Sequence, residues 1–142
     1  MSKSHDKKLE VIRNLLIIGK FIKSMEFTRT KYKLSTTEIV IIMLLLEKLN
    51  IYHPYLDINM SELIDLSGIC KKNLHRVITS LFDKNVITMV FRPKMSKIQF
   101  QPSFITDIDE DTGKVFHKWV KDNKKDIQEV VDNDWRRIHS TR

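Results

Sequence analysis

The alternation of apolar and polar positions is most regular between residues 60 and 87, in MSELIDLSGICKKNLHRVITSLFDKNVI. A short first helix and a turn centred on Gly68 are followed by a helix with apolar residues at i, i+3, i+4 and i+7, the stripe of a helix that packs on one side. The stripe consists of Leu74, Val77, Ile78 and Leu81. The opposite face carries Lys71, Lys72, Asn73, His75, Arg76 and Thr79. The pattern predicts a helix-turn-helix whose second helix presents a cationic face.

The segment from Ile39 to Leu49 is apolar on nearly all sides. Ser35 can cap the free backbone amides at the start of a helix, and Glu38 stands three residues later, where it completes a capping box. Because a helix without a polar stripe belongs in the interior, we expect this helix to be the most buried one. It would support the helix-turn-helix.

The N-terminal residues 6–27 predict an amphipathic helix with a wide apolar face, followed by a basic link at residues 31–33. The stripe consists of Leu9, Ile12, Leu15, Leu16 and Ile22, and it is widened by Ile17, Ile18, Phe21 and Met25. This is more apolar surface than one packing contact needs. Two interpretations stay open: a face of the core, which we favour, or the seam of a homodimer.

Two short strands are predicted after the helix-turn-helix, at residues 86–91 and 96–101, with a turn at residues 92–95. Pro102 ends the second strand because proline cannot continue a ladder. The loop at residues 50–58 can end in a strand that joins this sheet. We interpret residues 105–113, ITDIDEDTG, as an acidic linker. Residues 114–138 read as a final helix.

The predicted fold is therefore mostly α: a winged helix-turn-helix with a short β-hairpin wing and flanking N- and C-terminal helices. Residues 1–34 form the leader helix and basic link, residues 35–105 the winged-helix domain, and residues 106–142 the acidic linker and C-terminal helix.

Length and composition agree with one globular domain. The 142 residues are 42% hydrophobic, with only three Gly and three Pro. The longest apolar run, residues 39–46, is far shorter than the roughly 20 residues that a membrane span needs, and the N-terminus lacks the features of a secretory signal. The single cysteine excludes an internal disulfide. We therefore expect a cytoplasmic protein without a membrane partner.

The net charge of +7 is unevenly distributed. Residues 71–104 hold seven Lys or Arg against one acid, whereas residues 35–70 hold one Lys against five acids. A surplus on the second helix and the hairpin indicates a polyanionic partner; the alternative is a solvated basic surface with no partner.

Double-stranded DNA is the partner that these residue types suit best. Arg76 can donate two hydrogen bonds to guanine, and Asn73 can pair with adenine in the same way. Lys71 and Lys72 lie at the helix start, where positive charge and backbone donors suit a phosphate. His75 and Thr79 lie on the same face. The remaining candidates, for backbone or minor-groove contacts, are Lys84, Arg92, Lys94 and Lys97.

Other chemistry finds little support. The acids Asp107, Asp109 and Asp111 alternate as in a calcium loop, but Thr112 stands where such a loop requires glycine. The five histidines have no metal-ligand spacing. Cys70, at the cap of the second helix, reads as a small tolerated residue rather than a redox switch. We expect no enzyme active site and no cofactor.

Residues 38–105 resemble winged-helix DNA-binding domains, and in particular the RepL-type plasmid replication proteins of Gram-positive bacteria and their phage relatives. The resemblance lies in EIVIIMLLLEKLN, LDINMSELIDLSGI, KKNLHRVITSLFDKNVI and KIQFQPSFI. It implies origin binding and recruitment of host replication proteins. Two features depart from the family: Gln101-Pro102 stands where Asn-Pro is common, and no strands precede the helices.

Two alternatives remain open. KYKLSTTEIVII is similar to the entry into the second helix of MarR- and SarA-like transcription regulators, which would imply a homodimer through the N- and C-terminal helices and RNA polymerase as a further partner. The long wing of that family, with its Asp-x-Arg signature, is missing. A winged-helix module that binds protein is the third reading, and the cationic face argues against it.

Overall fold

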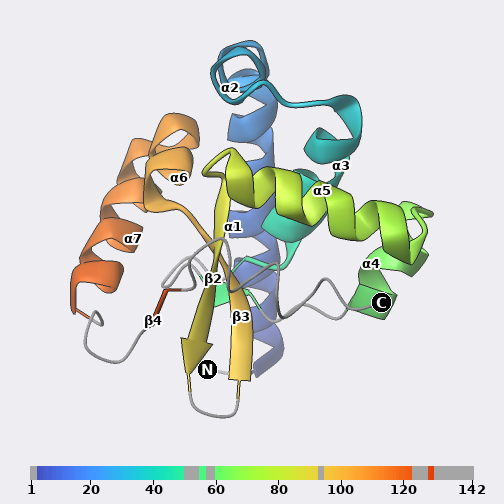
Figure 1. The fold of residues 1–142 in the computed structure, drawn as a ribbon. Coiled ribbons are helices and arrows are strands. Elements are labelled where there is room, and N and C mark those ends of the chain that lie inside the picture. Colours follow the sequence, from blue (N-terminus) through green and yellow to red (C-terminus); the bar gives the residue numbers. More distant parts are fainter. Residues whose placement is uncertain (1–2, 50–54, 57–59, 93–94, 123–127, 130–142) are drawn as a thin grey trace.

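The computed structural model describes residues 3–49, 55–56, 60–92, 95–122 and 128–129. Helices dominate this part of the chain, as predicted, and a small antiparallel sheet accompanies them (Figure 1). In chain order the elements are α1 (Lys3–Lys23), α2 (Met25–Tyr32), α3 (Thr36–Glu47), β1 (Tyr55–Leu56), α4 (Met60–Ser67), α5 (Lys71–Asp83), β2 (Ile87–Arg92), β3 (Met95–Phe100), α6 (Pro102–Ile108), α7 (Glu110–Asp122) and β4 (Gln128–Glu129).

The sheet has the strand order β1-β3-β2-β4, and every neighbouring pair is antiparallel. β2 and β3 form the predicted hairpin, with Ile87 opposite Phe100 and Arg92 opposite Met95. β1 adds to β3, as the sequence suggested. The prediction of one helix over residues 114–138 is wrong, because α7 ends at Asp122 and β4 pairs with β2.

One hydrophobic core joins the described helices with β1, β2 and β3. α3 lies at its centre, with Ile41, Ile42, Leu45 and Leu46 fully buried. The predicted capping box is present: the Ser35 hydroxyl accepts from the Glu38 amide at 3.1 Å, and the Glu38 carboxylate accepts from the Ser35 amide at 2.7 Å. An aromatic cluster closes the core on the side of α6. There Phe104 lies 6.1 Å from Phe21 of α1 and 6.0 Å from Phe100 of β3, measured between ring centroids.

The acidic linker was a wrong prediction. Residues 102–122 form two helices, α6 and α7, and Pro102 occupies the first turn of α6, where its missing N–H costs nothing. Asp107 accepts hydrogen bonds from Lys31 at 2.7 Å and from the Tyr32 hydroxyl at 2.6 Å. Asp109 pairs with Lys20 at 2.8 Å. Asp107 and Asp109 therefore attach α6 to α2 and α1 instead of lying in solvent.

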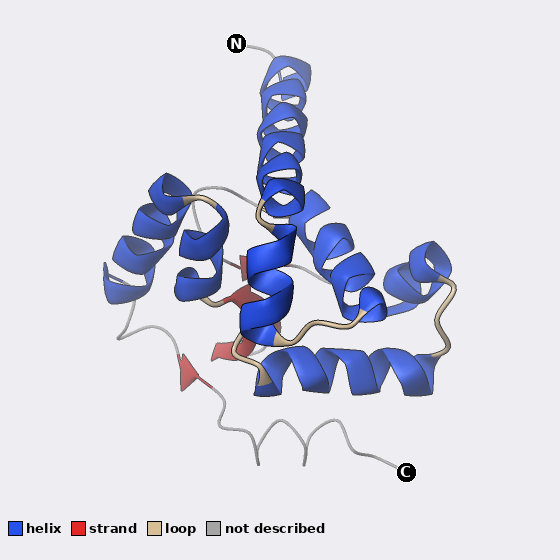
Figure 2. Ribbon diagram, turned by 90° about the horizontal axis from the view of Figure 1, so that it is seen from above, coloured by secondary structure: helices blue, strands red, loops and turns tan. Residues whose placement is uncertain are grey.

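Our preference for the core is confirmed for only part of the wide N-terminal stripe, namely Ile17, Phe21 and, partly buried, Ile18 and Met25. α1 packs through Ile17 and Phe21, and the Asn14 amide donates to the Glu47 carbonyl at the end of α3, at 2.8 Å. The five residues of the predicted stripe point outward and are exposed. Figure 2 shows the N-terminal half of α1 projecting from the body, on the side away from α5. The predicted basic link at residues 31–33 is largely the last turn of α2.

No helix in the described ranges has both the length and the apolarity that crossing a bilayer requires.

Candidate nucleic-acid interface

The candidate interface begins with α4 and α5, which are joined by the three-residue turn 68–70. Gly68 ends α4 with a φ of +72°, a left-handed conformation that glycine adopts without steric cost. Its amide donates to the Ile64 carbonyl at 2.9 Å, and the Ile69 amide donates to the Ser67 hydroxyl at 3.2 Å. These bonds close the turn and fix the point at which α5 begins.

The inner face of α5 is the one that the sequence predicts. Leu74, Ile78 and Leu81 are at most 1% exposed, and Val77 packs partly against the same core. α5 contacts α3, α4 and β2. Burial of these aliphatic side chains stabilises the fold by about 1.5–3 kcal/mol each, so the helix cannot rotate about its axis without exposing them.

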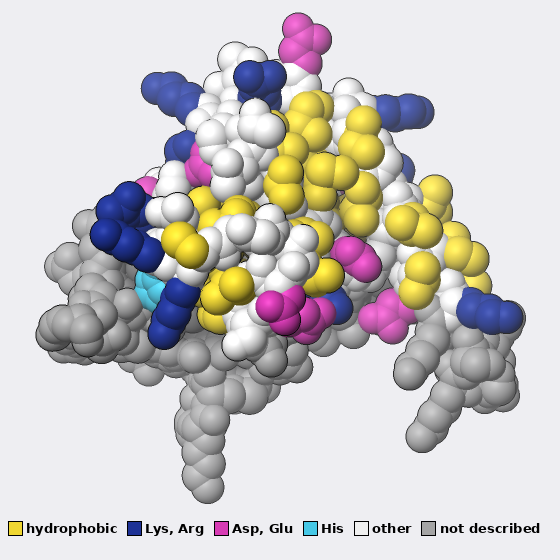
Figure 3. Space-filling view, turned by 90° about the vertical axis from the view of Figure 1, so that its right-hand side faces the viewer, with side chains coloured by type: hydrophobic (Ala, Val, Ile, Leu, Met, Phe, Trp, Pro, Cys, Tyr) yellow, Lys and Arg dark blue, Asp and Glu magenta, His cyan; other side chains and the backbone are white. Residues whose placement is uncertain are grey.

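The outer face of α5 presents most of the predicted DNA-binding residues to solvent. Lys71, Lys72, Asn73 and Arg76 are exposed, whereas His75 and Thr79 are half-buried beside them. Lys71, Lys72 and Arg76 take part in none of the ion pairs found between described residues. The positive charge of these three side chains is therefore not neutralised by a described carboxylate. α5 lies along one edge of the molecule in Figure 2, and cationic side chains gather at the left of Figure 3.

The N-terminus of α5 adds backbone donors to this face. Cys70 holds the N-cap position in an extended conformation, is exposed, and makes no capping hydrogen bond through its side chain. The first amides of a helix lack partners inside the helix, and they carry the positive end of its dipole. Lys71 and Lys72 lie beside these amides, so both sources of positive potential coincide.

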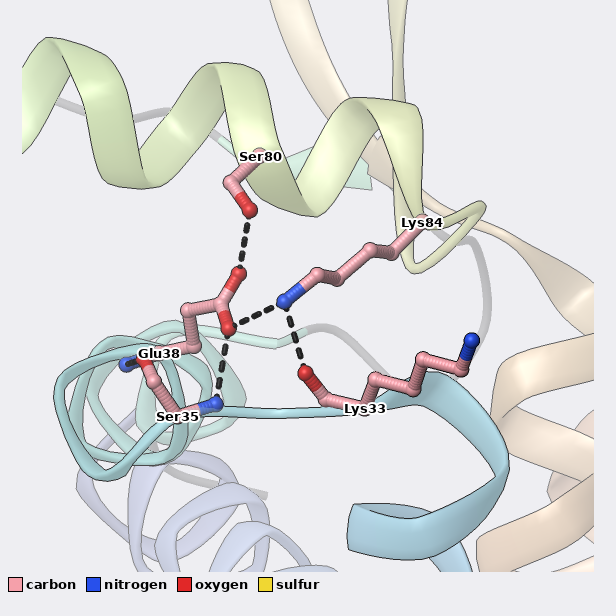
Figure 4. A network of polar contacts seen from close by, with 5 residues as sticks. All are labelled: Lys33, Ser35, Glu38, Ser80 and Lys84. Carbon is pink, nitrogen blue, oxygen red and sulfur yellow. Dashed lines mark hydrogen bonds and ion pairs between the residues drawn. The ribbon is translucent and has the colours of Figure 1, made fainter.

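Lys84, which the sequence predicted as a DNA contact, is instead bonded to other parts of the protein. Its ammonium donates to Glu38 Oε1 at 2.6 Å and to the Lys33 carbonyl at 2.7 Å, and Ser80 donates to Glu38 Oε2 at 2.6 Å (Figure 4). Burial acts to raise the pKa of Glu38, but the hydrogen bonds from Lys84, Ser80 and the Ser35 amide outweigh it and lower the pKa below its ordinary value. Lys84 thus serves the fold: it anchors the end of α5 to the start of α3.

The role of Ser80 in this network was missed. Ser80 and Lys84 are four residues apart, which places them on one side of the chain. The sequence gives no sign of their common acceptor, because Glu38 lies 46 residues before Lys84.

The predicted hairpin cations divide into two groups. Arg92 ends β2 and Lys97 lies in β3, opposite Val90, so both belong to the hairpin that follows α5. Lys94 lies outside the described residues.

Other chemistries gain no support from the described ranges, where no three His, Cys, Asp or Glu residues are grouped so as to hold a metal ion.

Comparison with models of protein families, with curated proteins and with solved structures finds no match to this chain.

Proposed function

We propose that this chain is a winged-helix protein that binds double-stranded DNA, with α5 as the recognition helix. The order α3, β1, α4, α5, β2, β3 is the order of helices and strands in a winged helix. The observation that carries the proposal is the division of α5: its aliphatic side is buried, and Lys71, Lys72 and Arg76 on the other side are exposed and form no ion pair with a described carboxylate. A major groove about 12 Å wide admits a helix with such a face.

The residues of α5 divide into two roles in this proposal. Arg76 and Asn73 point outward from the first two turns and suit guanine and adenine edges. Lys71 and Lys72, beside the free amides of the helix start, suit phosphates. His75 and Thr79 are secondary contacts on the same side. Arg92, Lys94 and Lys97 in the hairpin would contact the backbone or the minor groove, whereas Lys84 is excluded because it is paired with Glu38.

For the biological role we propose replication initiation of the RepL type. The resemblance of residues 38–105 to that family supports it, with host replication proteins as further partners. Transcription control of the MarR or SarA type is the alternative, favoured by the uncovered face of α1, which a dimer would bury. Loss of a plasmid or phage replicon on deletion of this chain would support initiation. A single palindromic site upstream of a gene, with replication unaffected, would support transcription control.

The DNA proposal is tested by selecting bound sequences from random duplexes at two salt concentrations. We expect one enriched motif and an affinity that falls steeply with salt, because phosphate contacts release counterions. Recovery of no motif, together with binding no tighter than that of a Lys71→Ala/Lys72→Ala/Arg76→Ala variant, would contradict the proposal. A Lys114→Ala/Lys118→Ala/Lys121→Ala variant removes the same number of charges from exposed positions of α7 and is the control.

A further inference from the structure

The outward face of α1 carries a group of large apolar side chains that are exposed to solvent. Leu15 and Leu16 are 58% and 61% exposed, and the same face holds Leu9, Val11, Ile12 and Ile22. Figure 3 shows hydrophobic side chains gathered as a continuous band on the right, apart from the cations on the left. α1 is thus apolar on two sides, and only one of them is covered in the described part of the structure.

Gly19 lies in the middle of this face. Ile12, Leu15, Leu16 and Gly19 follow one another at i, i+3, i+4 and i+7, so they share one side of the helix. Glycine inside a helix costs about 0.5–1 kcal/mol relative to alanine. Nothing in the described chain compensates for this cost, because a Cβ added at Gly19 would meet no atom within 4 Å. A glycine is required there only if another backbone approaches that point.

The charges at the ends of the face limit how a partner helix can lie. Lys8 precedes the apolar residues, and Lys23 follows them; both are exposed. Two copies of α1 aligned in parallel would place each lysine beside its equivalent, and an antiparallel alignment centred on Leu15 and Leu16 would place Lys8 beside Lys23. A crossing near −50° is the commonest helix packing, and it separates the ends. Close approach at Gly19 fits such a crossing.

The size of the face also fits a second copy. The largest apolar patch of a typical monomer covers roughly 300–600 Å², and the face of α1 holds six apolar side chains that are each 37–61% exposed. A specific interface buries about 1,000 Å² or more in total, to which two copies of this face would contribute equally. A symmetric dimer needs a self-complementary surface, and a straight ridge with a small residue at its centre is complementary to itself.

The geometry points to a homodimer in which the α1 helices of two copies cross at Gly19 and cover each other's apolar face. This inference concerns α1 alone and does not rest on DNA binding. It places the dimer contact on the projecting helix, away from α5.

The test is the mass of the full chain in solution without DNA, by sedimentation equilibrium over a range of micromolar concentrations. We expect twice the chain mass of 16.9 kDa. Leu16→Glu should weaken the dimer by at least about tenfold, because it would bury a carboxylate without a partner. Val115→Glu, which changes an apolar residue of α7 that is 44% exposed, should leave the dimer unchanged. A monomeric wild type, or equal effects of the two variants, would overturn the inference.

Gly19→Gln supplies the second arm of the test. The new side chain meets no atom of the monomer and replaces a poor helix former, so the melting temperature of dilute protein should hold or rise. The same side chain holds the two helices apart, so the dimer should weaken by about tenfold or more. Unchanged dimerisation would overturn the crossing at Gly19. Monomeric wild type that cosediments with phosphatidylglycerol vesicles would show a lipid surface as the occupant and overturn the homodimer.

Discussion

Glu38 at the start of α3 accepts a hydrogen bond from the ammonium of Lys84, immediately after α5, at a distance of 2.6 Å. The pair fixes one end of α5, and the Gly68 turn fixes the other. The direction in which the cationic face points therefore depends on a contact between residues 46 positions apart.

Glu38→Gln should lower the free energy of unfolding by about 1–3 kcal/mol at neutral pH, because Lys84 loses the counter-charge of a nearly buried carboxylate. Urea denaturation measures this change. Glu62→Gln is the control, since the Glu62–Lys48 pair is solvent-exposed and surface pairs contribute about 0–1 kcal/mol. Equal losses in the two variants would contradict the importance of the Glu38 network.

The same network predicts an acid dependence. The folded-state pKa of Glu38 lies below its ordinary value of 4.5, so its contribution is complete above that pH and is lost as the pH falls through the folded pKa. Glu38→Gln should therefore flatten the decline of stability on the acid side. Denaturation curves of the two proteins that run parallel below pH 4.5 would show that Glu38 has no such role.

The surroundings of Tyr32 predict a loss of folding stability at alkaline pH. Burial, followed by the hydrogen bond to Asp107, raises the pKa of Tyr32 above its ordinary value of 10.0. The unfolded chain then ionises first, so stability falls as the pH rises above 10.0. Tyr32→Phe should cost about 1 kcal/mol at neutral pH and remove part of this alkaline decline. Urea denaturation at neutral pH and above pH 10 measures both changes. If the stability of Tyr32→Phe fell with pH as steeply as that of the wild type, Tyr32 would not be the cause of the alkaline decline.

Arg76→Ala should weaken binding to the selected duplex by about 1–3 kcal/mol and relax the preference at one base pair. Lys72→Ala should weaken binding to all duplexes alike and reduce the salt slope by about 1. Fluorescence anisotropy at several salt concentrations measures both effects, with Lys118→Ala as the charge-matched control. Arg76→Ala protein that loses affinity without any change in preference would remove the base-reading role.

Leu74→Ala should lower the free energy of unfolding by about 2–5 kcal/mol, because Leu74 is fully buried on the inner face of α5. Arg76→Ala, on the other side of the same helix, should change it by no more than about 0.5 kcal/mol. Thermal melts of the two variants compare the faces of α5 directly. A larger loss of stability in Arg76→Ala than in Leu74→Ala would mean that α5 is rotated about its axis relative to this structure.

Gly113→Ala should destabilise the pair formed by α6 and α7. A Cβ at Gly113 would lie 2.6 Å from the Thr106 Cα, and this backbone atom cannot move aside cheaply. Overpacking of this kind costs about 1–3 kcal/mol or more. Val115→Ala, at an exposed position of the same helix, is the control for the change in melting temperature. Equal melting temperatures for Gly113→Ala and wild type would show that the two helices separate easily.

The sequence predicted the features that depend on neighbours along the chain. The capping box of Ser35 and Glu38 and the buried stripe of α5 follow from local spacing, and the structure contains both. The hairpin and β1 also follow from local patterns.

The errors arose where distant parts of the chain decide the outcome. α1 has two apolar sides, and periodicity cannot tell which of them faces the core; Phe21 rather than Leu16 does so because α3 and α6 lie there. Asp107 and Asp109 looked like residues of a solvated linker because Lys20 and Lys31 are more than 70 positions away. Pro102 was a local sign of the α6 start that was read only as the end of a strand.

The aromatic cluster around Phe104 limits how this chain can be shortened or transferred. Phe21 comes from α1 and Phe100 from the hairpin, while Phe104 itself belongs to α6, so no single stretch of sequence holds the cluster. A fragment of residues 35–105 would lack the ring of Phe21 and leave Phe104 open to water on that side. The proposed recognition helix α5 therefore cannot be transferred to another protein by itself: a fusion protein would have to carry α1 and α6 along with it.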